Sequence, residues 1–181
     1  MKNYPTLKTL HTVHSLQSFV KSNASILIYS TLLSSSIFLP SVIHQQGITG
    51  PIINAILILT TVWFGSSQAM MVGVLPSLVA LSRGLLPLPL APVVPFIMVA
   101  NCFLVLTFDQ LKSKSFFLAV VGAASVKFFF LYLVSQVLLA NLLPGKFLTP
   151  ASQMMSWPQL VTALTGGLIA WLVLKKMPKL I

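Results

Sequence analysis

The chain has 181 residues, of which 56% are hydrophobic and only 7% are charged, whereas a soluble domain usually carries about 25% charged residues. This composition, with a mean hydropathy of +0.96, excludes a soluble globular protein and indicates an integral membrane protein. The formal charge is +10, from eleven Lys and Arg residues against the single acid Asp109, and because the basic residues lie at the ends of apolar stretches, this charge indicates membrane topology rather than nucleic-acid binding.

The first 22 residues are polar and basic, and they include Lys2, Lys8 and Lys21. Apolar residues recur along one side of this segment, as in a short helix at the membrane interface, and a disordered tail fits the composition equally well. The apolar stretch that follows lacks a small-residue cleavage site, so we expect an uncleaved span rather than a signal peptide. We therefore expect a basic cytoplasmic segment over residues 1–22 and a membrane domain over residues 23–181.

Six apolar stretches are predicted to cross the bilayer, which takes about 20 helical residues. They are residues 24–43, 51–64, 69–81, 94–108, 116–140 and 157–174. The third stretch is short and contains Pro76, which predicts a kinked or partly unwound helix. Four prolines within residues 87–95 predict an extended external segment that dips toward the membrane. Residues 141–156 are predicted to form a longer loop.

The distribution of basic residues predicts the orientation of these spans. Six spans place both termini on one side of the membrane, together with Lys2, Lys8, Lys21, Lys112, Lys114, Lys175, Lys176 and Lys179. Arg83 and Lys146 fall on the opposite side, and Lys127 lies within a span. Because cytoplasmic loops carry the excess of Lys and Arg, we expect an all-α bundle of six transmembrane helices in the cell membrane, with both termini cytoplasmic.

Small residues recur at a spacing of four in several of the predicted spans. Examples are Ser30 and Ser34 in the first span and Gly73 and Ser77 in the third. This spacing lets helix backbones approach closely. It is explained either by packing inside the bundle or, for the first span in particular, by docking of a partner membrane subunit.

Lys127 lies near the middle of the fifth apolar stretch. A charged side chain at the centre of a bilayer costs roughly 2.5–3.5 kcal/mol on insertion scales, so it is a candidate functional residue. Asp109 lies at the inner end of the preceding span, too far in depth for a direct ion pair. Two roles remain open for Lys127: it holds a substrate carboxylate or phosphate, or it bonds helix carbonyls that nearby prolines leave free.

Further polar residues fall in the middle or outer parts of the predicted spans. They are Asn54, Asn101, Gln136, Trp157, Gln159 and Thr162. With the first external loop, which supplies His44, Gln45, Gln46 and Thr49, they predict an outward-facing cavity for a small organic solute. Each also has a structural explanation, because interhelical hydrogen bonds are worth about 0.6 kcal/mol on average and Trp157 suits an interfacial anchor.

Groups that carry catalysis or bind metals are scarce. The single cysteine, Cys102, excludes a disulfide framework and a Cys-ligated iron–sulfur cluster. One aspartate without any glutamate excludes a paired-carboxylate mechanism. His11 and His14 are three residues apart without a third ligand, and no phosphate-binding loop motif occurs. We therefore expect neither an enzyme nor a bound cofactor or metal.

Three stretches resemble the substrate-binding S component of energy-coupling factor (ECF) transporters of bacteria. They are QQGITGPIINAILIL at 45–59, VGVLPSLVALSRGLLPLPLAPVVPFIMVAN at 72–101 and SWPQLVTALTGGLIAWLVLK at 156–175. The resemblance covers about residues 24–175. It implies a six-helix protein that binds a vitamin, a precursor or a trace nutrient from outside and associates with a transmembrane scaffold subunit and two cytoplasmic ATPase subunits.

The resemblance also implies a docking site on the first helix. The family usually carries an alanine pair at four-residue spacing there, and in this chain serines, Ser30 and Ser34, occupy that spacing. No substrate-specific signature is present, so the resemblance does not name the ligand. The alternative is a structural membrane protein, such as a cell-shape complex subunit of the MreD type. Such a protein would need no ligand pocket, and its polar residues would be buried in helix contacts.

Overall fold

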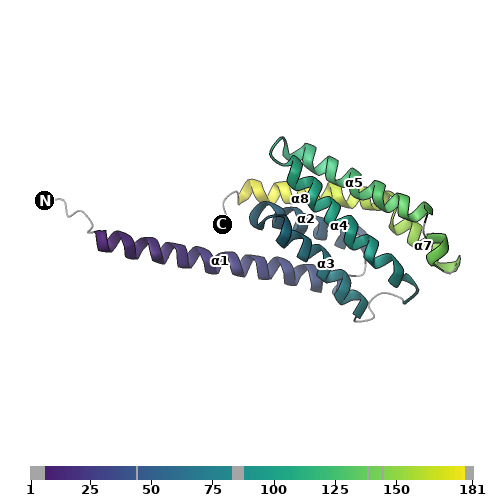
Figure 1. The fold of residues 1–181 in the computed structure, drawn as a ribbon, viewed down its shortest axis with the longest axis horizontal. Helices are drawn as coiled ribbons and strands as arrows, with labels where there is room; N and C mark the ends of the chain where they lie inside the picture. Colours follow the sequence, from purple (N-terminus) through teal and green to yellow (C-terminus); the bar gives the residue numbers. More distant parts are fainter. Residues whose placement is uncertain (1–6, 44, 83–87, 138, 144, 178–181) are drawn as a thin grey trace.

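The protein was analysed in a computed structural model, which describes residues 7–43, 45–82, 88–137, 139–143 and 145–177. Within these residues the chain forms helices and no strands. In chain order the helices are α1 (Leu7–Val42), α2 (Gln46–Phe64), α3 (Ser66–Ser82), the 3₁₀-helix η1 (Leu88–Val93), α4 (Val94–Leu111), α5 (Phe116–Val137), α6 (Leu139–Leu142), α7 (Gly145–Met154) and α8 (Trp157–Lys176). Figure 1 shows the longer helices running side by side in one bundle.

The bundle has the apolar helices of a multi-pass membrane protein. Among the described residues, five helical segments are long and apolar enough to cross a membrane. They are Ser22–Val42, Gln46–Phe64, Ala91–Leu111, Phe116–Val137 and Gly145–Lys176, and the last contains both α7 and α8. Helix α3 is apolar but shorter, with 17 residues. Each of the six predicted spans therefore coincides with an apolar helix, and five of these helical segments are long enough to cross a membrane. The all-helical prediction is confirmed for the described residues.

Helix α2 occupies the centre of the bundle, packed against α8, α3, α4 and α1. Its sequence from Asn54 to Thr61 is buried throughout. A helix that is apolar on every side is expected to be surrounded by protein. The two buried threonines in this run, Thr60 and Thr61, donate their hydroxyls to carbonyls four residues earlier at 2.7 Å, so neither leaves a polar group unpaired.

Glycines on α8 allow this close packing. A Cβ added at Gly166 would lie 2.6 Å from Asn54 Cβ and 2.7 Å from the Pro51 carbonyl oxygen, while one at Gly167 would overlap Val120 of α5. Both glycines are buried. Gly166 and Gly167 therefore serve internal packing, because α8 contacts α2 and α5 at these positions.

Helix α1 lies at the side of the bundle. It contacts α3 and α2, yet the exposed fractions of Leu27, Phe38 and Val42 are 68%, 67% and 75%. In Figure 1 its N-terminal part extends beyond the other helices, and the end of α8 lies toward that same end of the bundle. Helix α1 includes described residues of the predicted basic segment 1–22, which favours the helical interpretation over a disordered tail; residues 1–6 lie outside the described part.

Two local predictions need correction, and one of the two alternatives is excluded for a third. The proline-rich stretch is not extended over Leu88–Val93, which forms η1, because the φ of about −65° that proline imposes also suits a 3₁₀-helix. Residues 83–87 lie outside the described part. The predicted loop over residues 141–156 contains helix α7, whose Ala151 packs with the following Met155 in a buried cluster that includes Leu131 of α5. Helix α3 continues on both sides of Pro76, which excludes the partly unwound helix and leaves the kink as a prediction.

Candidate functional site

Lys127 is buried in the middle of the bundle between two asparagines. Its side chain is 3% exposed, and its Nζ donates hydrogen bonds to Asn54 Oδ1 at 2.8 Å and to Asn101 Oδ1 at 2.9 Å. These side chains come from α5, α2 and α4 and so join three helices. Both acceptors are side-chain amide oxygens, whereas one sequence-based alternative placed helix carbonyls around this lysine.

The two amides are held in a fixed orientation by backbone carbonyls. Asn54 Nδ2 donates to the Gly50 carbonyl at 2.9 Å, and Asn101 Nδ2 donates to the Gly73 carbonyl of α3 at 3.1 Å. Since each NH₂ group is used in this way, each oxygen is left to accept from Lys127. A Cβ at Gly73 would lie 3.2 Å from Asn101 Cβ, so a glycine here lets the amide approach the α3 backbone.

Asp109, the single acidic residue of the sequence, lies away from Lys127. Asp109 Oδ1 forms an ion pair with Lys112 Nζ at 2.6 Å near the end of α4. As predicted from its depth, Asp109 is therefore not the partner of Lys127. The amides of Asn54 and Asn101 satisfy hydrogen bonds of Lys127 but bring no negative charge, and a charge in a membrane interior is costly unless it is compensated.

Lys127, Asn54 and Asn101 line a cavity of about 290 Å³. The cavity extends to the beginning of α2, where Gln46 and Thr49 line it, and to Gln159 of α8. Gln46 precedes Asn54 by eight residues, which is about 12 Å along a helix. The apolar residues of the lining include Ile37, Ile53, Val94 and Ile97.

Two glutamines at the end of the cavity near Gln46 share one hydrogen-bond acceptor. The carbonyl oxygen of Met154, the last residue of α7, accepts from Gln46 Nε2 at 3.2 Å and from Gln159 Nε2 at 3.0 Å. Met154 itself lines the cavity. The corner between α7 and α8 is thereby attached to the start of α2, on the side of the cavity away from Lys127.

The structure brings together only some of the residues predicted for the site. Lys127, Asn54, Asn101 and Gln159 line the cavity, as do Gln46 and Thr49 of the predicted external loop, while His44 lies outside the described residues. Gln136 is exposed, and its Nε2 donates to Ser135 Oγ at 3.4 Å.

Thr162 and Trp157 also lie away from the cavity lining. Thr162 is buried, but its hydroxyl donates to the Gln159 carbonyl of its own helix, and its methyl group packs close to Gly50. Trp157 is 67% exposed, which suits the alternative explanation of an interfacial anchor.

Other lining residues were missed by sequence reasoning. Pro40 and Ser41 near the end of α1 and Ser77 of α3 line the cavity, and Gly50 and Gly73 supply the carbonyls that orient the amides. Serines and glycines are common in membrane helices for packing reasons, so their sequence positions carry little signal. Their proximity to Lys127 becomes visible only once the helices are packed.

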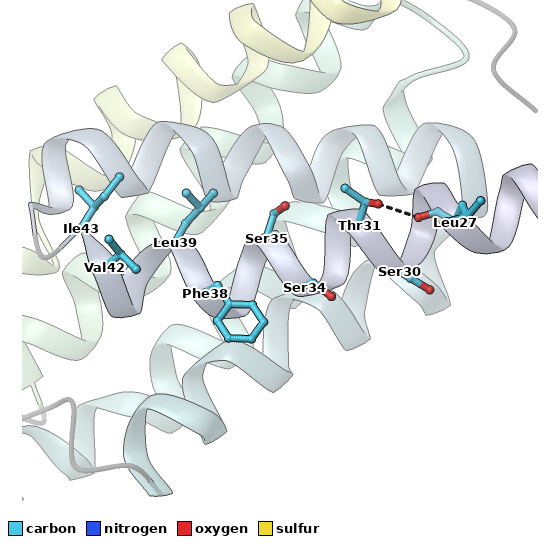
Figure 2. Close-up of a pocket in the computed structure, with 9 residues that line it drawn as sticks. All are labelled: Leu27, Ser30, Thr31, Ser34, Ser35, Phe38, Leu39, Val42 and Ile43. Carbon is cyan, nitrogen blue, oxygen red and sulfur yellow. Dashed lines mark hydrogen bonds between the residues drawn. The ribbon is translucent and has the colours of Figure 1, made fainter.

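A second, shallow hollow lies along α1 itself (Figure 2). Ser30, Ser34 and Phe38 follow one another along α1 in this view, and all three are exposed. The neighbouring Thr31 donates its hydroxyl to the Leu27 carbonyl at 2.8 Å, so it offers no free donor. The predicted docking pair, Ser30 and Ser34, is thus on the surface and takes no part in the packing of α1 against the bundle.

The cavity and the exposed face of α1 are described from this chain alone. No protein-family model, curated protein or solved structure matches this chain.

Proposed function

We propose that this protein is the substrate-capture subunit of an ECF-type nutrient uptake transporter in the cell membrane. The observation that carries the proposal is the cavity of about 290 Å³ with Lys127, Asn54 and Asn101 at one end and Gln46 and Gln159 at the other. Its volume lies near the lower limit of small-molecule sites, which are roughly 300–1,000 Å³, and its mixture of apolar walls and a few polar groups is typical of them.

The sequence resemblance to S components supplies the second support. It implies capture of a vitamin, a precursor or a trace nutrient on the outside and transfer through a scaffold subunit driven by two ATPase subunits. The chain's few acids and its single cysteine, Cys102, favour a binding subunit over an enzyme. The energy for uptake would come from the partner ATPases, because this sequence carries no phosphate-binding loop motif.

The orientation proposed for the chain has six spans, namely the apolar part of α1 together with α2, α3, α4, α5 and α8, and cytoplasmic termini. The end of the cavity at Gln46 and Gln159 then faces outward, on the same side as Lys146 at the start of α7. The basic residues Lys112 and Lys114 between α4 and α5, and Lys175 and Lys176 at the end of α8, face the cytoplasm.

This topology is tested with reporter fusions. Reporters placed after Lys114 and at the C-terminus are both expected to read cytoplasmic, and one beside Lys146 is expected to read external, because eight basic residues share the cytoplasmic side in this arrangement. The measurement is paired alkaline phosphatase and fluorescent-protein activity at each site. An external C-terminus would exclude the six-span arrangement.

The exposed face of α1 is the surface proposed for the scaffold subunit. Ser30 and Ser34 are small and exposed, and Leu27 and Phe38 beside them offer apolar surface to a partner helix. Small residues at four-residue spacing allow close helix–helix approach. The rest of the bundle leaves this face uncovered, so a partner can reach it without rearranging the cavity.

Replacing both Ser30 and Ser34 with Leu is expected to reduce co-purification of the scaffold subunit at least several-fold, because the added side chains keep the partner backbone away. The folded protein should be unaffected, since both positions are exposed. Thr165→Leu, an exposed small-to-large change on α8, serves as the matched control. An undiminished complex in the double variant would remove this face from the interface.

The alternative, a structural protein of the MreD type, is favoured by one observation. Asn54 and Asn101 both accept hydrogen bonds from Lys127 and thereby join α2, α4 and α5, as in a purely structural polar network. The two functions differ in what the cavity does. A structural protein has no use for a solute inside it, whereas a capture subunit binds a solute there before any partner is present.

A further inference from the structure

We infer that the cavity selects a small monocarboxylate, whose carboxylate binds Lys127; this inference rests on the proposed capture function and names its substrate class. An ammonium group has three N–H donors. Among the described residues, Lys127 donates to Asn54 Oδ1 and to Asn101 Oδ1, which leaves one N–H for a group inside the cavity. A ligand group at this place must therefore accept a hydrogen bond.

The fixed amides leave the ammonium as the charged group at this end of the cavity. Because Gly50 and Gly73 hold the NH₂ groups of Asn54 and Asn101, the amide oxygens remain turned toward Lys127, and each accepts a hydrogen bond from it. The charge that a ligand meets at this place is therefore that of the ammonium. A ligand amine or guanidinium would meet a like charge, whereas a carboxylate would form a charge-assisted hydrogen bond.

The number of charges favours a monoanion over a phosphate dianion. Lys127 is 3% exposed, and Asp109 is engaged by Lys112, so the local charge is that of one ammonium. One carboxylate neutralises it. A dianion would leave a net negative charge within an apolar bundle, which is costly where no water solvates it.

The rest of the cavity limits the size and the polarity of the ligand beyond its carboxylate. The volume of about 290 Å³ corresponds to about ten water-sized groups, using about 30 Å³ for each. Ile37, Ile53, Val94 and Ile97 give the cavity apolar walls. At the far end, Gln46 Nε2 and Gln159 Nε2 both donate hydrogen bonds to the Met154 carbonyl oxygen. The Oε1 atoms of the two glutamines are then available to a hydroxyl or N–H of the ligand. The expected ligand is a compact, largely apolar acid, optionally with a donor at the end away from its carboxylate.

The test compares probes of equal size and different charge on the purified protein in phosphatidylcholine nanodiscs. Benzoate, benzamide and benzylamine are added separately at millimolar concentration, and the unfolding temperature is followed. Benzoate is expected to raise this temperature in the wild type, while benzamide and benzylamine raise it less, because only benzoate pairs its charge with Lys127. Inorganic phosphate is expected to have a smaller effect than benzoate.

A substitution of Lys127 tests whether benzoate binds at this side chain. Lys127→Met keeps length and bulk but removes the charge, and it is expected to weaken benzoate binding about 10- to 150-fold while leaving benzamide unchanged. If this variant does not fold, the wild-type comparison of the three probes decides alone. Benzamide equal to benzoate, stronger binding of benzylamine, or no response to any probe overturns the inference.

Octanoate, an aliphatic acid of a size that the cavity can hold, is included to identify the source of the carboxylate. Stabilisation by octanoate that exceeds that by benzoate and is lost in Lys127→Met supports a monocarboxylate that enters from the bilayer as a short fatty acid. Stabilisation by benzoate alone supports a water-soluble acid. These measurements need no partner subunit, so a negative result here leaves the ECF assignment to be judged by complex formation, and absence of the complex leaves the carboxylate result intact.

Discussion

Replacing Asn101 with Leu is expected to destabilise the folded protein by about 3 kcal/mol, the scale for leaving a buried charged donor without an acceptor. Asn101 Oδ1 accepts from Lys127 at 2.9 Å, and its Nδ2 joins α4 to the Gly73 carbonyl of α3. Leucine removes both bonds but keeps the buried lysine. The measurement is the free energy of unfolding in mild detergent.

A second substitution separates lost hydrogen bonding from lost packing. Adding Lys127→Met to Asn101→Leu is expected to recover most of the stability, because the ammonium that lost one of its two acceptors is then absent. Gln136→Leu, which changes an exposed amide on α5, serves as the control and should be neutral. If the double variant is less stable than Asn101→Leu alone, Lys127 contributes to stability independently of its bond to Asn101.

Gly166→Leu is expected to prevent correct packing of α8 on α2. Overpacking a well-filled core typically costs about 1–3 kcal/mol and occasionally more. Here the first added carbon would already lie 2.7 Å from the Pro51 carbonyl oxygen and 2.9 Å from the Ala55 nitrogen. Backbone atoms cannot move aside as a flexible side chain can, so we expect the upper end of this range or loss of the folded protein.

The matched control is Gly47→Leu, near the start of α2, the helix on which α8 packs. An added Cβ at Gly47 meets nothing within 4 Å. It should leave folding unchanged. The readout is the yield of monodisperse protein by size-exclusion chromatography, followed by thermal unfolding. Equal stability of the two variants would mean that α8 does not approach α2 as closely as the structure places it.

Much of the helical framework could be predicted because the apolar stretches are long and few residues interrupt them. Lys127 was recognisable as a candidate site residue because it interrupts one of these apolar stretches, and a lone charge in a membrane helix is costly. Depth along the span also selected Asn54 and Asn101, which line the cavity with Lys127. Helix α7 was not predicted because residues 145–154 are short and contain Pro150, and its helical form is supported by burial of Ala151 against other helices.

The predicted site residues that lie outside the cavity lining show what depth alone omits. Gln136 follows Lys127 by nine residues, and at about 100° per residue the two side chains point to opposite faces of α5. The exposed position of Gln136 follows directly from this rotation. Gly50 and Gly73, by contrast, act through their backbone carbonyls, and no property of the glycine side chain marks such a role in a sequence.

The most direct test of the proposed function is purification of the tagged protein from its native membranes, followed by mass spectrometry of the intact assembly. A capture subunit is expected to elute in a stoichiometric complex with one membrane scaffold subunit and two ATPase subunits, joined through the α1 face at Ser30 and Ser34. Elution alone, or with cell-wall and cell-shape proteins and without ATPase subunits, would contradict the assignment.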